Sequence, residues 1–131
     1  MTAFLVDLEN KPGALATVAE ALGQRGVNIT TVSGASCGDS GRAVITTADD
    51  ATARSVFQTL KTKFKEYEVT EASLANTPGS LGKATRRLAD AGVNIEAIMP
   101  TGMSGNDVQV GFVTDNPTKA RDILATVATH R

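Results

Sequence analysis

The sequence predicts an α+β fold built from two tandem βαββαβ units, each an antiparallel sheet with its helices on one face. One observation is a repeat: residues 8–32 recur 66 positions later as residues 74–98, with ten of 25 positions identical. The identities fall on turn, capping and apolar positions, where backbone geometry restricts the residue type. The other is an apolar pattern that changes between strand and helix periods. We expect one unit over residues 1–69 and the other over residues 70–131.

A short apolar run and the helix-breaking residues after it predict the first strand and the first helix. Residues 3–8 contain Phe and Val and predict a strand. Pro12 is typical of a first helical position, where its missing N–H costs nothing. Apolar residues at three- and four-residue spacing then predict a helix over about residues 12–25, closed by Gly26. The chain thus opens with a strand, a turn and a helix.

The rest of the first unit reads as a hairpin, a helix and a strand. Residues 27–35 and 42–47 are rich in Ile, Val and Thr and are separated by a glycine-containing turn. Asp49 and the adjacent Asp50 precede a second amphipathic helix, and one of them is suited to cap it. Residues 66–75 return to strand. This order gives a ferredoxin-like arrangement.

The second unit repeats the pattern but stops early. We expect strands at 72–75, 93–99 and 108–113 and helices at 78–91 and 117–129. The last strand of this unit is missing from the sequence, which leaves a strand edge without a neighbour. An open edge needs cover, from a cross-unit pairing or from a partner chain.

The region between the two units supplies part of that cover. Residues 65–76 are long enough to serve as the last strand of the first unit and the first strand of the second. Units of roughly 65 residues are marginal alone, so we expect a shared core or sheet. We also expect a homodimer.

Composition excludes several functions. The chain has 41% hydrophobic and 21% charged residues and a formal net charge of −1, with four Phe, one Tyr and no Trp. Such a chain has neither the basic surface nor the stacking platforms of a nucleic-acid binder. No apolar run approaches the roughly 20 residues that cross a bilayer, and no secretory signal is visible. We expect a cytoplasmic protein that binds neither nucleic acid nor membrane.

Catalytic residues are not apparent. Cys37 lies in a Gly/Ser-rich stretch, and His130, beside the C-terminus, is the one imidazole that could activate it. A small strand residue and a solvated terminal histidine explain both better. Asp49 and Asp50 fit helix capping better than acid/base work. We expect no enzyme activity, no cofactor and no metal.

Both copies carry a motif of a known family. A strand ends near Asn, x-Pro-Gly follows, an apolar residue stands two after the glycine, and Gly-Val-Asn-Ile enters the second strand. This pattern resembles the ACT domain. Two copies in register over residues 1–131 resemble the small free-standing proteins with two tandem ACT domains.

The resemblance implies binding of a small effector, usually an amino acid, between paired units, where the strand-to-helix loop of one faces the second strand of its neighbour. Carried over position by position, it implies two sets of ligand-binding residues, one per unit. They are Asn10, Pro12, Gly13, Ala14, Leu15, Asn28 and Ile29 in the first unit, and Asn76, Pro78, Gly79, Ser80, Leu81, Asn94 and Ile95 in the second.

The physical chemistry of a helix start agrees with such a site. First-turn N–H groups lack intrahelical acceptors and face the positive end of the helix dipole, so they can receive a carboxylate. Asn10 and Asn76 can offer a donor and an acceptor to an α-amino acid, although each also suits a turn. Asn28 and Asn94 equally suit the start of a strand after a helix-ending glycine. The two loops differ in charge and bulk, so the sites need not bind alike.

The leading hypothesis is a regulatory module without chemistry of its own, which an effector shifts between states by differential affinity. An alternative is a subunit that docks on an amino-acid biosynthetic enzyme and whose ligand site is vestigial. A small enzyme on this scaffold is the weakest hypothesis, because neither unit shows an activated nucleophile or a metal cluster.

Overall fold

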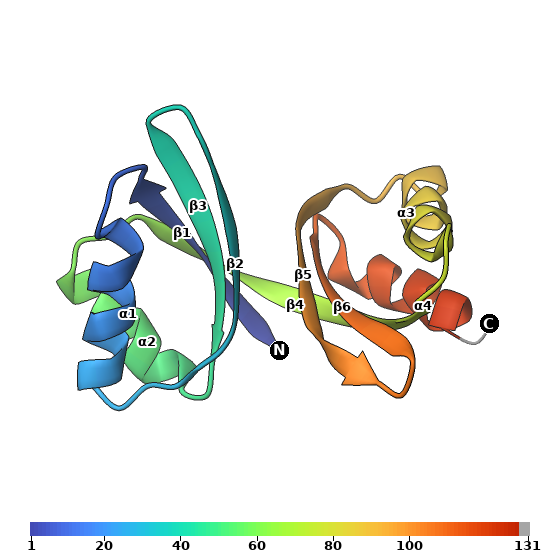
Figure 1. The fold of residues 1–131 in the computed structure, drawn as a ribbon. Coiled ribbons are helices and arrows are strands. Elements are labelled where there is room, and N and C mark those ends of the chain that lie inside the picture. Colours follow the sequence, from blue (N-terminus) through green and yellow to red (C-terminus); the bar gives the residue numbers. More distant parts are fainter. Residues whose placement is uncertain (129–131) are drawn as a thin grey trace. The chain divides into compact units, whose positions relative to one another are not determined.

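The computed structural model describes residues 1–128 and contains strands and helices in the predicted order (Figure 1). The elements are β1 (Thr2–Glu9), α1 (Ala14–Gln24), β2 (Ile29–Cys37), β3 (Ser40–Thr47), α2 (Asp50–Thr59), β4 (Phe64–Ala75), α3 (Ser80–Asp90), β5 (Ile95–Ser104), β6 (Asp107–Thr114) and α4 (Pro117–Ala128). The predicted end of the last helix at Thr129, and His130, lie outside the described residues.

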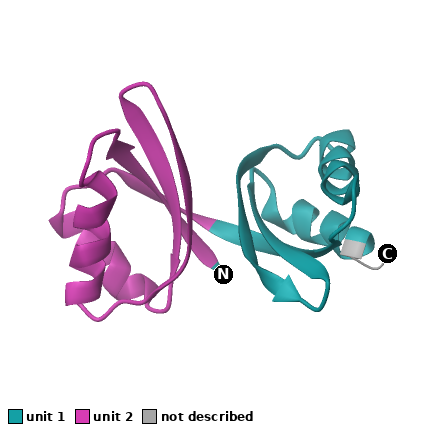
Figure 2. Cartoon of the chain, viewed as in Figure 1, with its two compact units in different colours: residues 1, 68–131 teal, residues 2–67 magenta. Residues whose placement is uncertain are grey.

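The chain forms two compact units, one of residues 2–67 and one of Met1 with residues 68–131 (Figure 2). In the first, the strand order is β2-β3-β1-β4, and β3 pairs antiparallel with β1 and with β2. In the second, the order is β4-β6-β5, and β6 pairs antiparallel with both neighbours. The 12-residue strand β4 therefore belongs to both units, which confirms the prediction of one strand with two roles.

Each unit buries its own core between sheet and helices. In the first, Phe4 of β1, Leu22 of α1 and Phe57 of α2 are fully buried. The rings of Phe4 and Phe57 have centroids 5.1 Å apart in a tilted arrangement. Such aromatic pairs add to the free energy gained from burying their area. Figure 1 shows α1 and α2 on the same face of their sheet, as the sequence predicts.

The second core uses equivalent elements. Leu88 of α3, Phe112 of β6 and Leu124 of α4 have at most 1% of their surface exposed, and Leu74 of β4 has 5% exposed. Leu88 stands 66 positions after Leu22, so the same helix position fills both cores. Within residues 1–128, no strand follows α4.

One prediction about the start of the first helix is wrong. Pro12 is not the first helical residue, because α1 begins at Ala14. The Ala14 N–H donates to the Lys11 carbonyl at 3.3 Å, and Gly13 has φ 89° and ψ −10°. These values describe a type II turn with Pro and Gly at its central positions. Gly79 repeats the geometry before α3, with φ 90° and ψ −9°.

The left-handed glycine gives a stability prediction. Gly13→Ala should lower the free energy of unfolding by about 1–2 kcal/mol, because an L residue is strained at positive φ, although a Cβ there would meet nothing within 4 Å. Gly23→Ala is the matched control: it lies inside α1 with equally open surroundings, and it should raise that free energy by about 0.5–1 kcal/mol. Urea denaturation measures both. Equal stability of the two variants would show that the turn does not need its left-handed residue.

Candidate functional site

A hollow of about 520 Å³ lies in the first unit, where β1 ends and α1 begins. The strand-to-helix loop contributes Asn10, and the first turn of α1 contributes Ala14 and Leu15. The middle of β2 supplies the opposite wall, which includes Val32, and Arg42 of β3 also lines the hollow. The predicted residues Asn10, Ala14 and Leu15 are thus brought together with a strand wall.

A second hollow of about 360 Å³ occupies the equivalent place in the other unit. Asn76, Ser80 and Leu81 line it from the loop and the start of α3, and Ile98 lines it from β5. Each of these residues stands 66 positions after a residue of the first hollow. The repeat in the sequence therefore produces a repeated cavity.

Both hollows have unusually exposed apolar walls. Leu15 and Val32 are 47% and 51% exposed, and their counterparts Leu81 and Ile98 are 49% and 41% exposed. A large apolar side chain that is half exposed beside a cavity is typical of a surface that meets a ligand or a partner. Val32 and Ile98 were not among the predicted site residues. They stand 66 positions apart, at equivalent places in the repeat, and this spacing of two apolar strand residues could have identified them from the sequence.

The helices that border the hollows lack the caps that the other two helices have. In α2, Asp49 Oδ1 accepts from the Thr52 N–H at 3.1 Å, and hydrogen bonds from Thr52 hold the pKa of Asp49 below its usual value. In α4, Asn116 Oδ1 accepts from the Lys119 N–H at 3.1 Å. No side chain caps α1 or α3, and neither helix has an acidic residue in its first turn.

The uncapped turns leave specific N–H groups without acceptors. The Ala14 N–H is used in the turn, and the Thr17 N–H donates to the Gly13 carbonyl. Within residues 1–128, the N–H groups of Leu15 and Ala16 have no acceptor. Of the predicted residues Gly13, Ala14 and Leu15, only Ala14 uses its N–H within the described part of the chain, and Ala16, whose N–H also lacks an acceptor there, was not predicted.

The second copy behaves in the same way. Ser80 N–H closes the turn onto the Thr77 carbonyl at 3.4 Å, and the Lys83 N–H donates to Gly79. The amides of Leu81 and Gly82 are left without acceptors among the described residues. An anion at either helix start would meet two N–H groups and the positive end of a helix dipole.

The loop asparagines differ between the units. Asn10 Nδ2 donates to the Gly38 carbonyl at 2.9 Å, and the Asn10 backbone N–H donates to the Asp39 carbonyl. The hairpin tip thus uses the side-chain donor that the sequence suggested for a ligand, while Oδ1 remains an acceptor. The Asn76 side chain has no hydrogen bond within the described part of the chain.

The structure does not bring the strand asparagines to the hollows. Asn28 and Ile29 follow α1, whose 11 residues separate them by about 16 Å from its first turn. The Asn28 carbonyl accepts from the Ala48 N–H at 3.0 Å, and Asn94 N–H donates to Asp115 Oδ1 at 2.9 Å.

Six more predicted residues do not line the hollows. Ile29 and Ile95 pack against the two cores. Pro12, Gly13, Pro78 and Gly79 form the turns that lead into the helices, and none of them lines a hollow.

The two hollows differ in charge. Glu9, Lys11 and Arg42 line the first. Glu9 and Lys11 form an exposed ion pair of 3.0 Å, and Arg42 Nε lies 3.0 Å from Asp7 Oδ1. At the equivalent positions the second hollow has Ala75, Thr77 and Val108. The first hollow is therefore suited to a more polar ligand than the second.

Potential metal ligands do not cluster among the described residues. Residues 1–128 contain no group of three or more His, Cys, Asp or Glu side chains that could hold a metal. Cys37 is exposed at the end of β2. None of the helices described here is long and apolar enough to cross a membrane.

Comparison with known families identifies the fold. The profile of the ACT domain matches residues 2–69, which is more than half of the chain. The protein belongs to the ACT domain family. The match covers β1 to the first half of β4, so the first hollow lies wholly within the ACT domain. No curated protein matches the sequence.

Solved structures extend the likeness over both units. A protein from Bacteroides thetaiotaomicron is 26% identical, with a TM-score of 0.78 over 95% of this chain and 86% of the other. The ligand-free regulatory subunit of aspartate kinase from Thermus thermophilus is 20% identical, with a TM-score of 0.68 over 98% and 89%. The same subunit from Thermus flavus is 19% identical, with a TM-score of 0.70 over 98% and 89%. These two subunits share the fold.

The uncapped start of α1 gives a prediction. Ala16→Glu places a carboxylate at an exposed first-turn position and should stabilise the ligand-free protein by about 0.3–1 kcal/mol, since it complements the helix dipole. Ala51→Glu is the control, because α2 already has its Asp49 cap and Asp50 in the first turn. Thermal unfolding at low salt measures both. Equal gains in the two variants would mean that α1 is no more receptive to an anion than α2.

Proposed function

We propose that this protein is a regulatory module of two tandem ACT units, over residues 1–69 and 70–131, which binds an amino acid at its strand-to-helix loops. It has no catalytic activity of its own. The observation that carries the proposal is the pairing, in both units, of an uncapped helix start with a half-exposed apolar wall. One feature suits the carboxylate of an amino acid and the other its side chain.

We assign a role in this proposal to each group of the first hollow. The N–H groups of Leu15 and Ala16 receive the carboxylate. Asn10 Oδ1, whose amide nitrogen is held by Gly38, accepts from the α-ammonium group. Leu15 and Val32 cover the aliphatic part of the ligand, and Arg42 selects for a polar or acidic end.

The second hollow is suited to a different ligand or to none. It keeps the uncapped turn and the apolar pair Leu81 and Ile98, but it lacks the charged groups of the first. An amino acid with an apolar side chain fits it best. A subunit that docks on an amino-acid biosynthetic enzyme, with a vestigial ligand site, is the second candidate, and the likeness to the two aspartate kinase regulatory subunits favours it.

Binding of an effector can be tested by thermal unfolding against the twenty amino acids in turn. At a hundred times its dissociation constant, an effector adds about 2.7 kcal/mol to the free energy of unfolding. Ala16→Glu should abolish the shift from the first hollow, because its carboxylate occupies the helix start. Ala51→Glu should leave the shift intact. No shift with any amino acid would favour the docking subunit, and a shift that survives in Ala16→Glu would place the effector elsewhere.

We further propose a homodimer. β2 stands at the end of the strand order and carries the exposed Val32, so a second copy can cover both its free edge and the first hollow. Light scattering should give a mass of twice 13.6 kDa. Val32→Lys should shift the protein toward a monomer, whereas Met103→Lys, at a side chain that is 60% exposed on β5, should not. A monomer mass for the unchanged protein at tens of micromolar would contradict the proposal.

A further inference from the structure

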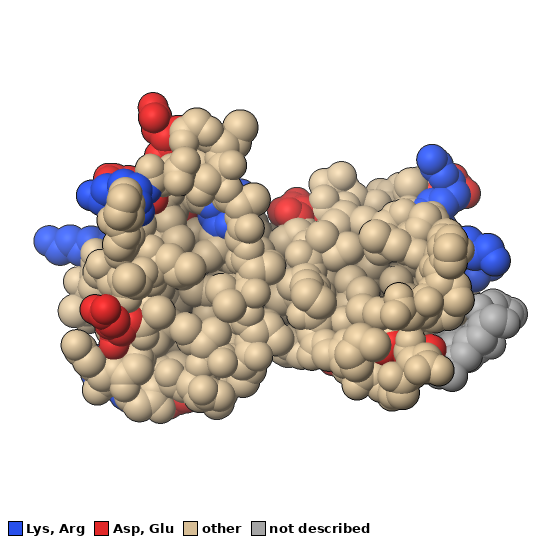
Figure 3. Space-filling model, viewed as in Figure 1, with Lys and Arg blue, Asp and Glu red and all other residues tan. Residues whose placement is uncertain are grey.

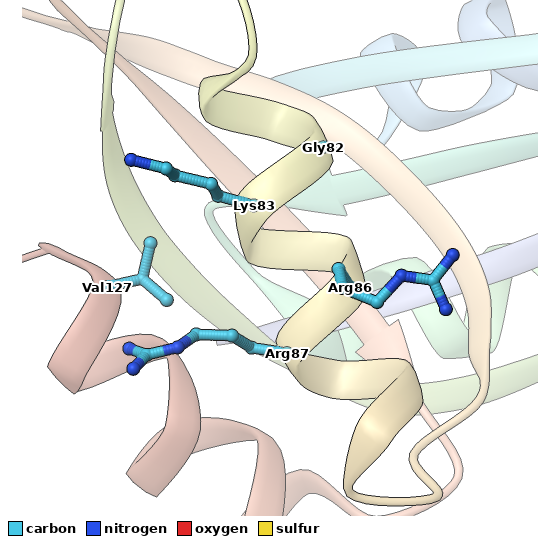
Figure 4. A pocket seen from close by; sticks show the side chains of 5 residues that line it. All are labelled: Gly82, Lys83, Arg86, Arg87 and Val127. Atoms are coloured by element: carbon cyan, nitrogen blue, oxygen red, sulfur yellow. The ribbon is translucent and has the colours of Figure 1, made fainter.

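A third hollow, of about 650 Å³, lies in the second unit between α3 and α4. Gly82, Lys83, Arg86, Arg87 and Val127 line it, and it shares no lining residue with the effector hollows (Figure 4). Lys83 and Arg87 extend from the side of α3 that faces Val127, whereas Arg86 extends from another side. Figure 3 shows blue side chains gathered over α3. The hollow is therefore a cationic groove with an apolar wall.

The two cations that face Val127 are close together and have no acidic partner among residues 1–128. Lys83 and Arg87 are four residues apart and so lie on one face of the helix, where like charges repel. Within residues 1–128, neither forms an ion pair; the ion pair described on α3 joins Arg86 to Asp90 at 3.9 Å. An anion between Lys83 and Arg87 would remove this repulsion.

One of the cations is already held in position. Arg87 Nη1 donates to Thr126 Oγ1 of α4 at 2.9 Å. A guanidinium has five N–H donors, so this bond orients the group and leaves others for a ligand. Preorganised donors lower the entropy lost when a ligand binds.

The fold does not require these charges. In α1, the positions equivalent to Lys83, Arg86 and Arg87 hold Thr17, Glu20 and Ala21, and the same 11-residue helix forms. The cations of α3 are therefore an addition to a scaffold that folds without them. Binding of an anionic ligand is the simplest explanation for cations that repel one another on the same helix.

Gly82 opens the groove further. It lies in the first turn of α3, a Cβ there would meet nothing within 4 Å, and no left-handed conformation demands glycine. Glycine destabilises a helix relative to alanine, so neither packing nor backbone conformation explains it. Its N–H group belongs to the helix start beside the second effector hollow, so the contribution of Gly82 to the groove is the open space left by its missing side chain.

We propose that this groove binds a phosphorylated small molecule, whose phosphate lies between Lys83 and Arg87. A phosphate monoester carries about −1.5 to −2 charges at neutral pH and can satisfy both cations, whereas a single carboxylate carries one. Arginine suits phosphate oxygens because its planar fork donates to two of them. The groove volume lies within the range of about 300–1,000 Å³ that is usual for small-molecule sites.

Inorganic pyrophosphate is the probe, titrated at constant ionic strength and followed by thermal unfolding and by ³¹P NMR line width. We expect saturable binding, weakened at least tenfold in the double variant Lys83→Gln with Arg87→Gln. Both side chains are exposed, so this variant should fold. Lys119→Gln with Arg121→Gln is the matched control: it removes the same charge from exposed positions of α4 that do not line the groove, and its binding should be unchanged.

Three results would overturn the proposal. The first is the absence of saturation. The second is equal weakening by the two double variants, which would indicate general charge screening. The third is tighter binding of an acidic peptide such as oligoglutamate than of pyrophosphate, which would mean that the groove receives a protein partner instead.

Discussion

The candidate effector site depends on one backbone constraint, the left-handed glycine at the third position of each type II turn. Because Gly13 and Gly79 occupy the N-cap positions, no side chain is available there to accept a hydrogen bond from the helix. Asp49 and Asn116 show what the same chain does where a cap is present. The turn therefore both starts the helix and leaves its first N–H groups open to solvent beside the hollow.

Local patterns in the sequence were enough to predict most of the architecture. The order of elements and the double role of β4 follow from apolar periodicity and from turn residues, which act over a few positions. The start of α1 was misplaced because Pro12 suits a first helical position and the second position of a type II turn equally well. The φ angle of Gly13 decides between them, and the sequence does not specify it.

The candidate site was predictable only in part, because its remaining features are long-range. The hydrogen bond from Asn10 to Gly38 joins residues 28 positions apart. Val32 lines the same hollow as Asn10, although a whole helix and a loop separate the two along the sequence. Asn28 stands in the same sequence motif as the loop, but a whole helix separates the two in space. The two copies of the repeat also differ in their side chains. Equivalent positions have the same backbone conformation, but charged residues line the first hollow and mainly apolar residues line the second.

Strand β4 has a consequence for how this chain can change during evolution. Phe64 packs against the first core, and Ala72 and Leu74 belong to the second, so even-numbered positions of a single strand serve both. Side chains of a strand alternate between its faces, and a shift of one residue exchanges them. A single codon inserted between positions 71 and 72, inside the segment that pairs with β6, would turn Ala72 and Leu74 away from their core. A flexible linker between two domains tolerates insertions, whereas each half of β4 must keep the alternation that points its apolar side chains into its own core.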